Sequence, residues 1–216
     1  MSARFSSVLL ALAGLPLLLA GCVTPQSHDY TAYRAHFPRS ILVLPPLNES
    51  TDIHATYSCL STVTMPLAEH GYYVFPVAVV DQLFKENGMP TPGEMHQAPL
   101  NKIREIIGAD AVLYITIKKY GSSYQVINSA TVVDAEASLV DTVSGTVLWT
   151  GKVAAQENSS GGTSSIIGEL VAALLTQIIS ESTDRARQVC RVANAQFGTQ
   201  RDGLLFGPYN PQFGTE

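Results

Sequence analysis

The chain alternates short apolar runs with polar segments, and the spacing of the apolar positions changes along its length. Runs rich in β-branched and aliphatic residues, with the length of buried strands, lie at 40–45, 72–77 and 111–117. Helical spacing fills the intervals at about 52–70, 81–87 and 101–107. Strands that alternate with helices indicate crossover connections and a partly parallel sheet.

From residue 131 onward the apolar period shortens to two. Residues 131–140 alternate aliphatic with polar side chains, which is typical of a strand with one exposed face. The stretch Asp141-Thr-Val-Ser-Gly145 then turns the chain, and residues 146–153 return it. Gly145 supplies the positive φ that such a turn requires. The pattern therefore predicts an antiparallel hairpin.

The longest helical pattern follows a Ser/Gly-rich stretch at 158–165. Two adjacent apolar stripes with steps of four are formed by Ile166, Leu170, Leu174 and Ile178, and by Ile167, Val171, Leu175 and Ile179. The period continues to Cys190 and Phe197, so Cys190 should point inward. The expected fold class is α/β, with a mixed sheet (β-α-β-α-α-β and then the hairpin) packed by helices and a long C-terminal helix.

The first residues have the layout of a bacterial lipoprotein precursor. One positive charge, Arg4, precedes an apolar run that is too short to span a bilayer. Leu19-Ala20-Gly21-Cys22 resembles a lipobox, whose cysteine receives acyl chains. Val23 stands where inner-membrane retention usually shows aspartate, which favours the outer membrane. The expected organisation is a signal peptide at 1–21, a lipidated tether at 22–39, one domain at 40–200 and a tail at 201–216.

Charge argues against nucleic acid as a partner. Removing residues 1–21 takes away only Arg4, which leaves 12 Lys/Arg against 18 Asp/Glu and a net charge of −6. Basic side chains do not cluster along the sequence, so phosphate would be repelled.

The cysteines suggest one disulfide. Once Cys22 is lipidated, Cys59 and Cys190 remain, an even number in an oxidising compartment. A Cys59–Cys190 bridge and two buried free thiols are both open at this point. The five histidines share no ligand spacing with either cysteine, so neither a metal site nor a cofactor is predicted.

The sequence offers no catalytic constellation, and we expect no enzymatic activity. The stretch "GGTSSIIGE" lacks the Gly-Lys-Ser/Thr of a phosphate loop, and no Gly-x-Ser-x-Gly elbow occurs. Asp134, Glu136 and Asp141 could be read as paired acids of an envelope hydrolase, but solubilising charge on a strand face explains them more simply. The apolar face at 166–179, which carries only Glu169 as an ionisable residue, packs on the sheet or meets another subunit or an envelope partner.

Three stretches carry a family resemblance: "GYYVFPVAVVDQLFKENGMPTPGEMH", "GADAVLYITI" and "SLVDTVSGTVLWTG". They resemble a family of Gram-negative outer-membrane lipoproteins that includes a meningococcal surface-lipoprotein antigen. The resemblance implies a fold similar to the N-terminal domain of TolB. It also implies that a CsgG-like lipoprotein and a second small lipoprotein are partners of this protein.

Two functions are therefore weighed. The first is a non-enzymatic envelope lipoprotein that serves as an assembly or accessory component of a transport or secretion apparatus, as a homodimer or with other lipoproteins. The alternative is a lipoprotein regulator of peptidoglycan synthesis, of the type that activates penicillin-binding proteins. Such an activator must cross the cell wall, and a tether of about 17 residues spans at most roughly 56–61 Å. The first function is therefore preferred.

Overall fold

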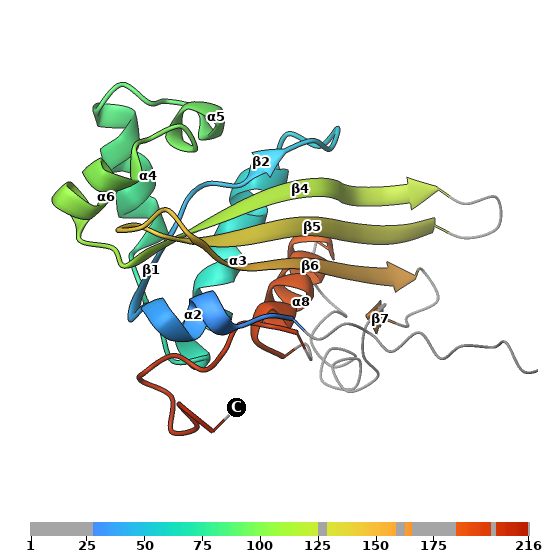
Figure 1. Ribbon diagram of the computed structural model, residues 1–216. Coiled ribbons are helices and arrows are strands. Elements are labelled where there is room, and N and C mark those ends of the chain that lie inside the picture. Colours follow the sequence, from blue (N-terminus) through green and yellow to red (C-terminus); the bar gives the residue numbers. More distant parts are fainter. Residues whose placement is uncertain (1–27, 125–128, 159–162, 166–184, 200–201, 216) are drawn as a thin grey trace, which may run out of the picture.

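The computed structural model describes residues 28–124, 129–158, 163–165, 185–199 and 202–215. In that part of the chain, a mixed sheet carries α3 (Ala55–Glu69) and α8 (Arg185–Thr199) on one face, and α4 (Val77–Glu86) and α6 (Leu100–Ile107) stand near one end (Figure 1). The α/β architecture predicted from the sequence is confirmed.

The sheet has a parallel part and an antiparallel part. Its strands are ordered β3-β1-β4-β5-β6-β7, and β2 also pairs with β4. β1 runs parallel to β3 and β4, and β2 runs parallel to β4, whereas the pairs β4–β5, β5–β6 and β6–β7 are antiparallel. The bounds are β1 Ser40–Val43, β2 Leu47–Asn48, β3 Tyr73–Val74, β4 Ala111–Tyr124, β5 Ser129–Asp141, β6 Val147–Asn158 and β7 Thr163–Ser165.

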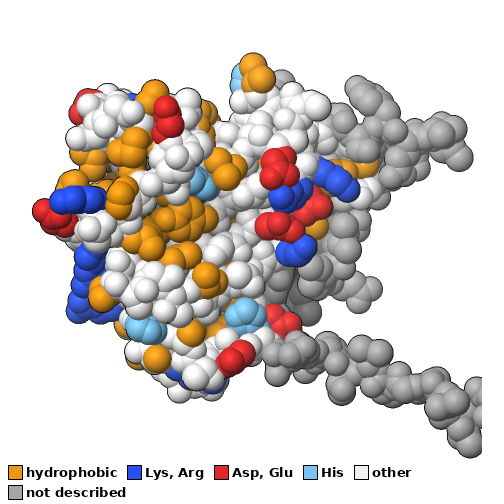
Figure 2. Space-filling model, turned by 45° about the horizontal axis from the view of Figure 1, so that its top comes forward, with side chains coloured by type: hydrophobic (Ala, Val, Ile, Leu, Met, Phe, Trp, Pro, Cys, Tyr) orange, Lys and Arg blue, Asp and Glu red, His pale blue; other side chains and the backbone are white. Residues whose placement is uncertain are grey.

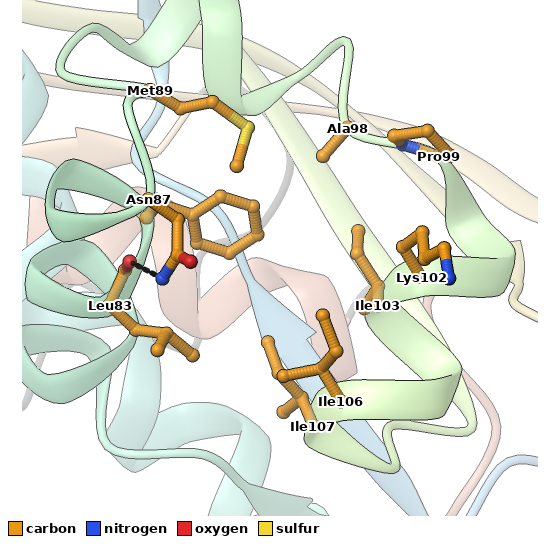
Figure 3. Close-up of a pocket in the computed structure, with 10 residues that line it drawn as sticks. Leu83, Asn87, Met89, Ala98, Pro99, Lys102, Ile103, Ile106 and Ile107 are labelled. Carbon is orange, nitrogen blue, oxygen red and sulfur yellow. Dashed lines mark hydrogen bonds between the residues drawn. The ribbon is translucent and has the colours of Figure 1, made fainter.

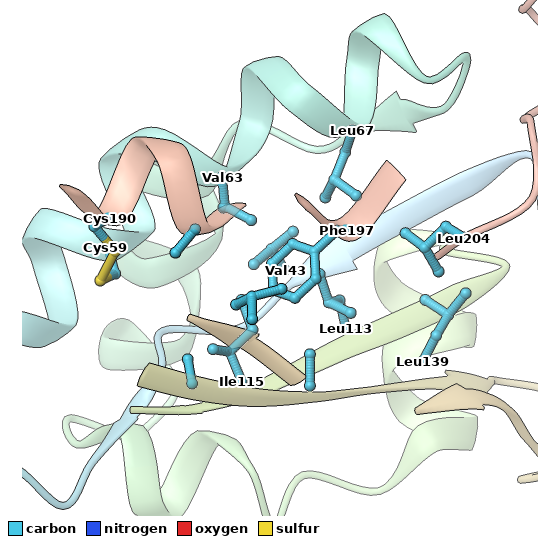
Figure 4. Packing of buried hydrophobic residues seen from close by; sticks show 14 of the residues in the cluster. Val43, Cys59, Val63, Leu67, Leu113, Ile115, Leu139, Cys190, Phe197 and Leu204 are labelled. Carbon is cyan, nitrogen blue, oxygen red and sulfur yellow. A yellow bond between two sulfur atoms is a disulfide. The ribbon is translucent and has the colours of Figure 1, made fainter. Parts of the chain in front are cut away.

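Two hydrophobic clusters cover opposite faces of β1 and the start of β4. The larger one lies between the sheet and the α3/α8 pair, where Val63, Leu113 and Phe197 meet (Figure 4). The smaller one joins Leu42 and Val112 to side chains of α4, α6 and the short helix α5 (Pro92–Met95). Because β1 and the start of β4 are buried on both faces, their sequences are continuous apolar runs.

The predicted hairpin is present as β5 and β6. Leu139 lies opposite Trp149 in the register, and Gly145 in the turn has a φ of +70°. The inward position after Trp149 is Gly151, where an added Cβ would clash with the indole ring. Glycine is therefore required on this strand because the large ring lies over its backbone.

Two strand predictions were wrong in their limits. The run at 111–117 continues as β4 to Tyr124 and pairs with β5 along its whole length, across an irregularity between Ile117 and Lys119. The stretch KKYGSS is polar apart from Tyr120 and carries no apolar period, so only its pairing with β5 identifies it as a strand. The strand expected at 72–77 shrinks to Tyr73–Val74, since α4 begins at Val77 directly after Pro76.

The folded body also extends beyond the predicted limits of 40 and 200. Helix α2 (Thr31–His36) lies within the expected tether, and its Tyr33 is fully buried. The Tyr33 and Tyr72 hydroxyls share a hydrogen bond, and the Tyr72 hydroxyl donates to the Leu205 carbonyl oxygen. Residues before and after the predicted domain are thus joined through Tyr33 of α2 and through Tyr72, which lies between α3 and β3.

The C-terminal helix is described from Arg185. Cys190, Ala193 and Phe197 are buried, as the apolar period predicts. The predicted stripes at 166–179 lie outside the described residues. α3 starts at Ala55, after the predicted caps, and the Asp52 side chain accepts a hydrogen bond from the His54 amide.

Candidate functional site

Two predictions concern cysteines, a Cys59–Cys190 bridge and lipidation of Cys22. Only the first involves described residues. Cys59 on α3 and Cys190 on α8 are joined by a disulfide with Cα atoms 5.5 Å apart (Figure 4). Beside it the Asn194 amide donates to the Cys59 carbonyl oxygen and to the Thr62 hydroxyl. The bridge therefore joins α3 to α8, two helices that are far apart in the sequence and pack on the same face of the sheet. Cys22, the predicted lipidation site, lies outside the described residues.

The three acidic candidates do not meet in a site. Glu136 lies on the exposed face of β5 between Lys152 at 2.6 Å and Lys118 at 3.7 Å, while Lys118 also contacts Glu49. Hydrogen bonding from Lys152 lowers the pKa of Glu136 below its usual value. Figure 2 shows acidic and basic side chains gathered in one group on this side of the molecule. The arrangement is a surface ion-pair network.

Asp141 stabilises the hairpin turn. Its Oδ2 accepts hydrogen bonds from the Ser144 amide and hydroxyl and from the Val143 amide, and His36 Nδ1 lies 3.7 Å away. Burial raises the pKa of the Asp141 carboxyl, but the hydrogen bonds and His36 outweigh it, so the pKa falls below 3.8. The sequence pattern predicted the turn, but it did not indicate that the Asp141 carboxylate accepts the hydrogen bonds that hold it.

The lowered pKa predicts a pH dependence of stability. A carboxyl whose pKa is depressed on folding contributes stability that is present above the unfolded pKa and is lost as pH falls through the folded pKa. We expect Asp141→Asn to lower the free energy of unfolding at pH 7 and to reduce its decline below about pH 4. Urea unfolding at pH 7 and at about pH 3 measures both effects. Parallel pH profiles for the two proteins would contradict the assignment.

The described ranges contain neither a candidate metal cluster nor a candidate membrane-spanning helix. Within them, His, Cys, Asp and Glu do not gather in groups of three that could hold a metal ion. In the same ranges, no helix combines the length and apolar content needed to cross a membrane.

A ridge of exposed side chains runs along α3 and is the first candidate surface. The α3 ridge consists of Tyr57, Ser61 and Met65, which recur every four residues and so share one face of the helix, together with Ile53 in the turn just before it. Ile53 is 83% exposed, Met65 52% and Tyr57 46%. The ridge therefore presents three large apolar or aromatic side chains to solvent close to one another.

Two arginines of α8 border the α3 ridge. Arg187 Nε donates to the Ser61 hydroxyl at 3.1 Å, and Arg191 Nη2 lies 3.9 Å from Met65 Sδ. A shallow concavity of about 320 Å³ lies where Ile53, Tyr57 and Ser61 meet Arg187. Apolar side chains beside guanidinium groups are typical of protein interfaces. Sequence reasoning missed this surface, because it depends on how α8 lies against α3.

The second candidate surface is an apolar pocket between α4 and α6. Its volume is about 250 Å³, and the buried side chains of Phe84 and Ile103 line it. Figure 3 shows Ile103 between the α4 side and the α6 side of the pocket. Lys102 and Asn87 are its most polar lining residues. The Asn87 side-chain amide donates to the Leu83 carbonyl oxygen at 2.7 Å, which fixes one side of the rim.

The family model and the curated relative that match this chain are both described as lipoproteins. The family described as "Putative lipoprotein GNA1162-like" matches residues 28–209. The lipoprotein NMB1124/NMB1162 of Neisseria meningitidis serogroup B is 42% identical over 205 residues, 93% of this chain and 95% of that protein.

Solved structures agree with this assignment. The crystal structure of lipoprotein GNA1162 from Neisseria meningitidis has 47% identity and a TM-score of 0.57, and covers 67% of this chain and 100% of that chain. A PelC dodecamer from Paraburkholderia phytofirmans matches at 14% identity and a TM-score of 0.45, over 82% of this chain and 96% of that one. That second likeness is too weak to bear on function. The chain belongs to the GNA1162-like family of lipoproteins.

Proposed function

We propose that the protein is a non-enzymatic lipoprotein of the outer membrane that serves as an accessory component of a transport or secretion apparatus and assembles with other lipoproteins. Membership of a lipoprotein family implies a lipid anchor in the envelope. In this proposal the anchor is Cys22 and the working part is a surface. The observation that carries it is the α3 ridge, with its exposed apolar side chains beside two arginines.

The charges suggest what meets the α3 ridge. Arg187 and Arg191 stand beside it, although the mature chain has a net charge of −6. A partner with acidic side chains around an apolar centre would be complementary there. A second copy would be repelled by the net charge of the remaining surface. The favoured partner is therefore another envelope lipoprotein, such as the CsgG-like protein or the second small lipoprotein that the family resemblance implies.

The length of the tether disfavours the alternative, a regulator of penicillin-binding proteins. His28 and Tyr30 already hydrogen-bond to Asp202 and Gly203, so the described body begins at residue 28. Residues 23–27 can span at most roughly 17–18 Å. A domain held so close to one membrane is better placed to act beside its anchor than across the wall.

Cross-linking in cells tests the proposed partner surface. A photoreactive residue at Ser61, exposed in the middle of the α3 ridge, should capture an envelope lipoprotein at native expression. A matched probe at Thr150, exposed on β6, should capture none. Ile53→Glu should abolish the Ser61 cross-link without lowering the melting temperature, because this side chain is 83% exposed. Recovery of only the monomer from Ser61, or equal capture from both positions, would contradict the proposal.

A further inference from the structure

We propose that the pocket between α4 and α6 binds a single straight acyl chain that ends in an anionic group, as a fatty acid does. This site is separate from the α3 ridge and does not depend on the partner proposed for it, but it rests on the proposed lipid anchor. The proposal rests on the closed apolar floor, on exposed apolar side chains at the mouth and on the sign of the charge there.

The pocket is apolar, and two of its lining residues are buried. Phe84 and Ile103 are 5% and 3% exposed and close the floor against the smaller hydrophobic cluster. Met89 and Ala98 form one wall, and Ile107 lies opposite them (Figure 3). A pocket of about 250 Å³ is slightly smaller than the usual range for drug-sized ligands, which begins at about 300 Å³. It fits a slender apolar group that enters from one side.

The mouth keeps apolar surface in contact with water. Ile106 lines the pocket and is 68% exposed, although the neighbouring turns of α6 bury Ile103. An acyl chain lying in the pocket would cover part of Ile106 and so remove this exposed surface.

The charge at the mouth favours an anionic head group. Lys102 is the single charged side chain among those that line the pocket in the described part of the chain. Its Nζ pairs with Glu105 Oε2 at 2.7 Å, but both side chains are more than half exposed. Exposed ion pairs of this kind contribute little free energy, so Lys102 can exchange Glu105 for another anionic group at low cost. A carboxylate above the pocket can therefore take the place of Glu105.

The membrane makes an acyl chain the favoured occupant over a side chain of a protein. A lipid-anchored domain lies beside a large reservoir of acyl chains. An extended peptide would in addition need free backbone partners, and the floor and walls of this pocket present apolar side chains instead.

Photolabelling of the lipidated full-length protein in phospholipid nanodiscs tests this site. The probe is palmitate with a diazirine in its chain, and the labelled peptides are mapped by mass spectrometry. We expect label on peptides that contain residues 83–89 and 98–107, and its loss with excess unlabelled palmitate. The matched diazirine-bearing alcohol should label these peptides about fivefold less, the effect of one exposed charge pair.

Three variants sharpen the test. Ile106→Glu places an acid at the mouth and should reduce labelling at least about tenfold. Val79→Glu is the matched control, because Val79 is 66% exposed on α4 and does not line the pocket, and labelling should be unchanged. Lys102→Ala should reduce palmitate labelling to the level of the alcohol. Label outside the pocket peptides, label that palmitate does not compete away, or equal labelling of Ile106→Glu and the unaltered protein would overturn the proposal.

Discussion

Replacing both Cys59 and Cys190 with alanine should lower the melting temperature by about 8–20 °C. The bridge closes a loop with a sequence separation of 131 residues. Restricting so long a loop in the unfolded chain is worth roughly 4–5 kcal/mol. For a domain of this size each kcal/mol shifts the melting temperature by about 2–4 °C. Thermal unfolding followed by circular dichroism measures the difference.

A reductant provides the matched control for the disulfide. Dithiothreitol should lower the melting temperature of the unaltered protein by a similar amount and leave the double variant unchanged. Single variants are less informative, because each leaves one buried thiol. Melting temperatures within about 2 °C for the unaltered protein and the double variant would contradict a stabilising bridge.

Trp149→Ala should lower the free energy of unfolding by about 3–5 kcal/mol. The indole is 1% exposed and meets the Phe197 ring nearly edge-on, with centroids 5.9 Å apart. Its Nε1 donates to the Asp202 carbonyl oxygen at 2.8 Å. One side chain therefore connects β6 to α8 and to the C-terminal segment. Trp149 is the single tryptophan, so circular dichroism in urea replaces fluorescence as the measurement.

Trp149→Phe separates packing from the hydrogen bond. Phenylalanine keeps most of the contact with Phe197 but loses the donor to Asp202, and should cost about 1–2 kcal/mol. If Trp149→Ala cost less than about 1 kcal/mol, the residue would not connect these three segments.

Sequence periodicity predicted the elements whose apolar pattern is local. The alternation at 131–140 gave the hairpin, and the helical period that reaches Cys190 and Phe197 gave the inward face of α8. The number of cysteines and the oxidising compartment indicated a bridge between Cys59 and Cys190 but left two free thiols open, and the structure shows the bridge.

Other features could not be read from the sequence, because they depend on tertiary contacts. Helix α2 has six residues and one buried side chain, Tyr33, too few to form an apolar period. The second half of β4 is polar and is held as a strand by its pairing with β5. The α3 ridge and the pocket arise from how α8 lies on α3 and how α6 lies beside α4.

The N-terminal peptide of the protein purified from outer membranes decides whether the domain works from a lipid anchor. Mass spectrometry should find a chain that begins at Cys22, carries acyl chains on that residue and lacks residues 1–21. A chain that retains its first 21 residues, or an unacylated Cys22 in protein recovered without membrane, would contradict it. The short reach from the bilayer and the proposed partnership with other envelope lipoproteins both depend on this modification.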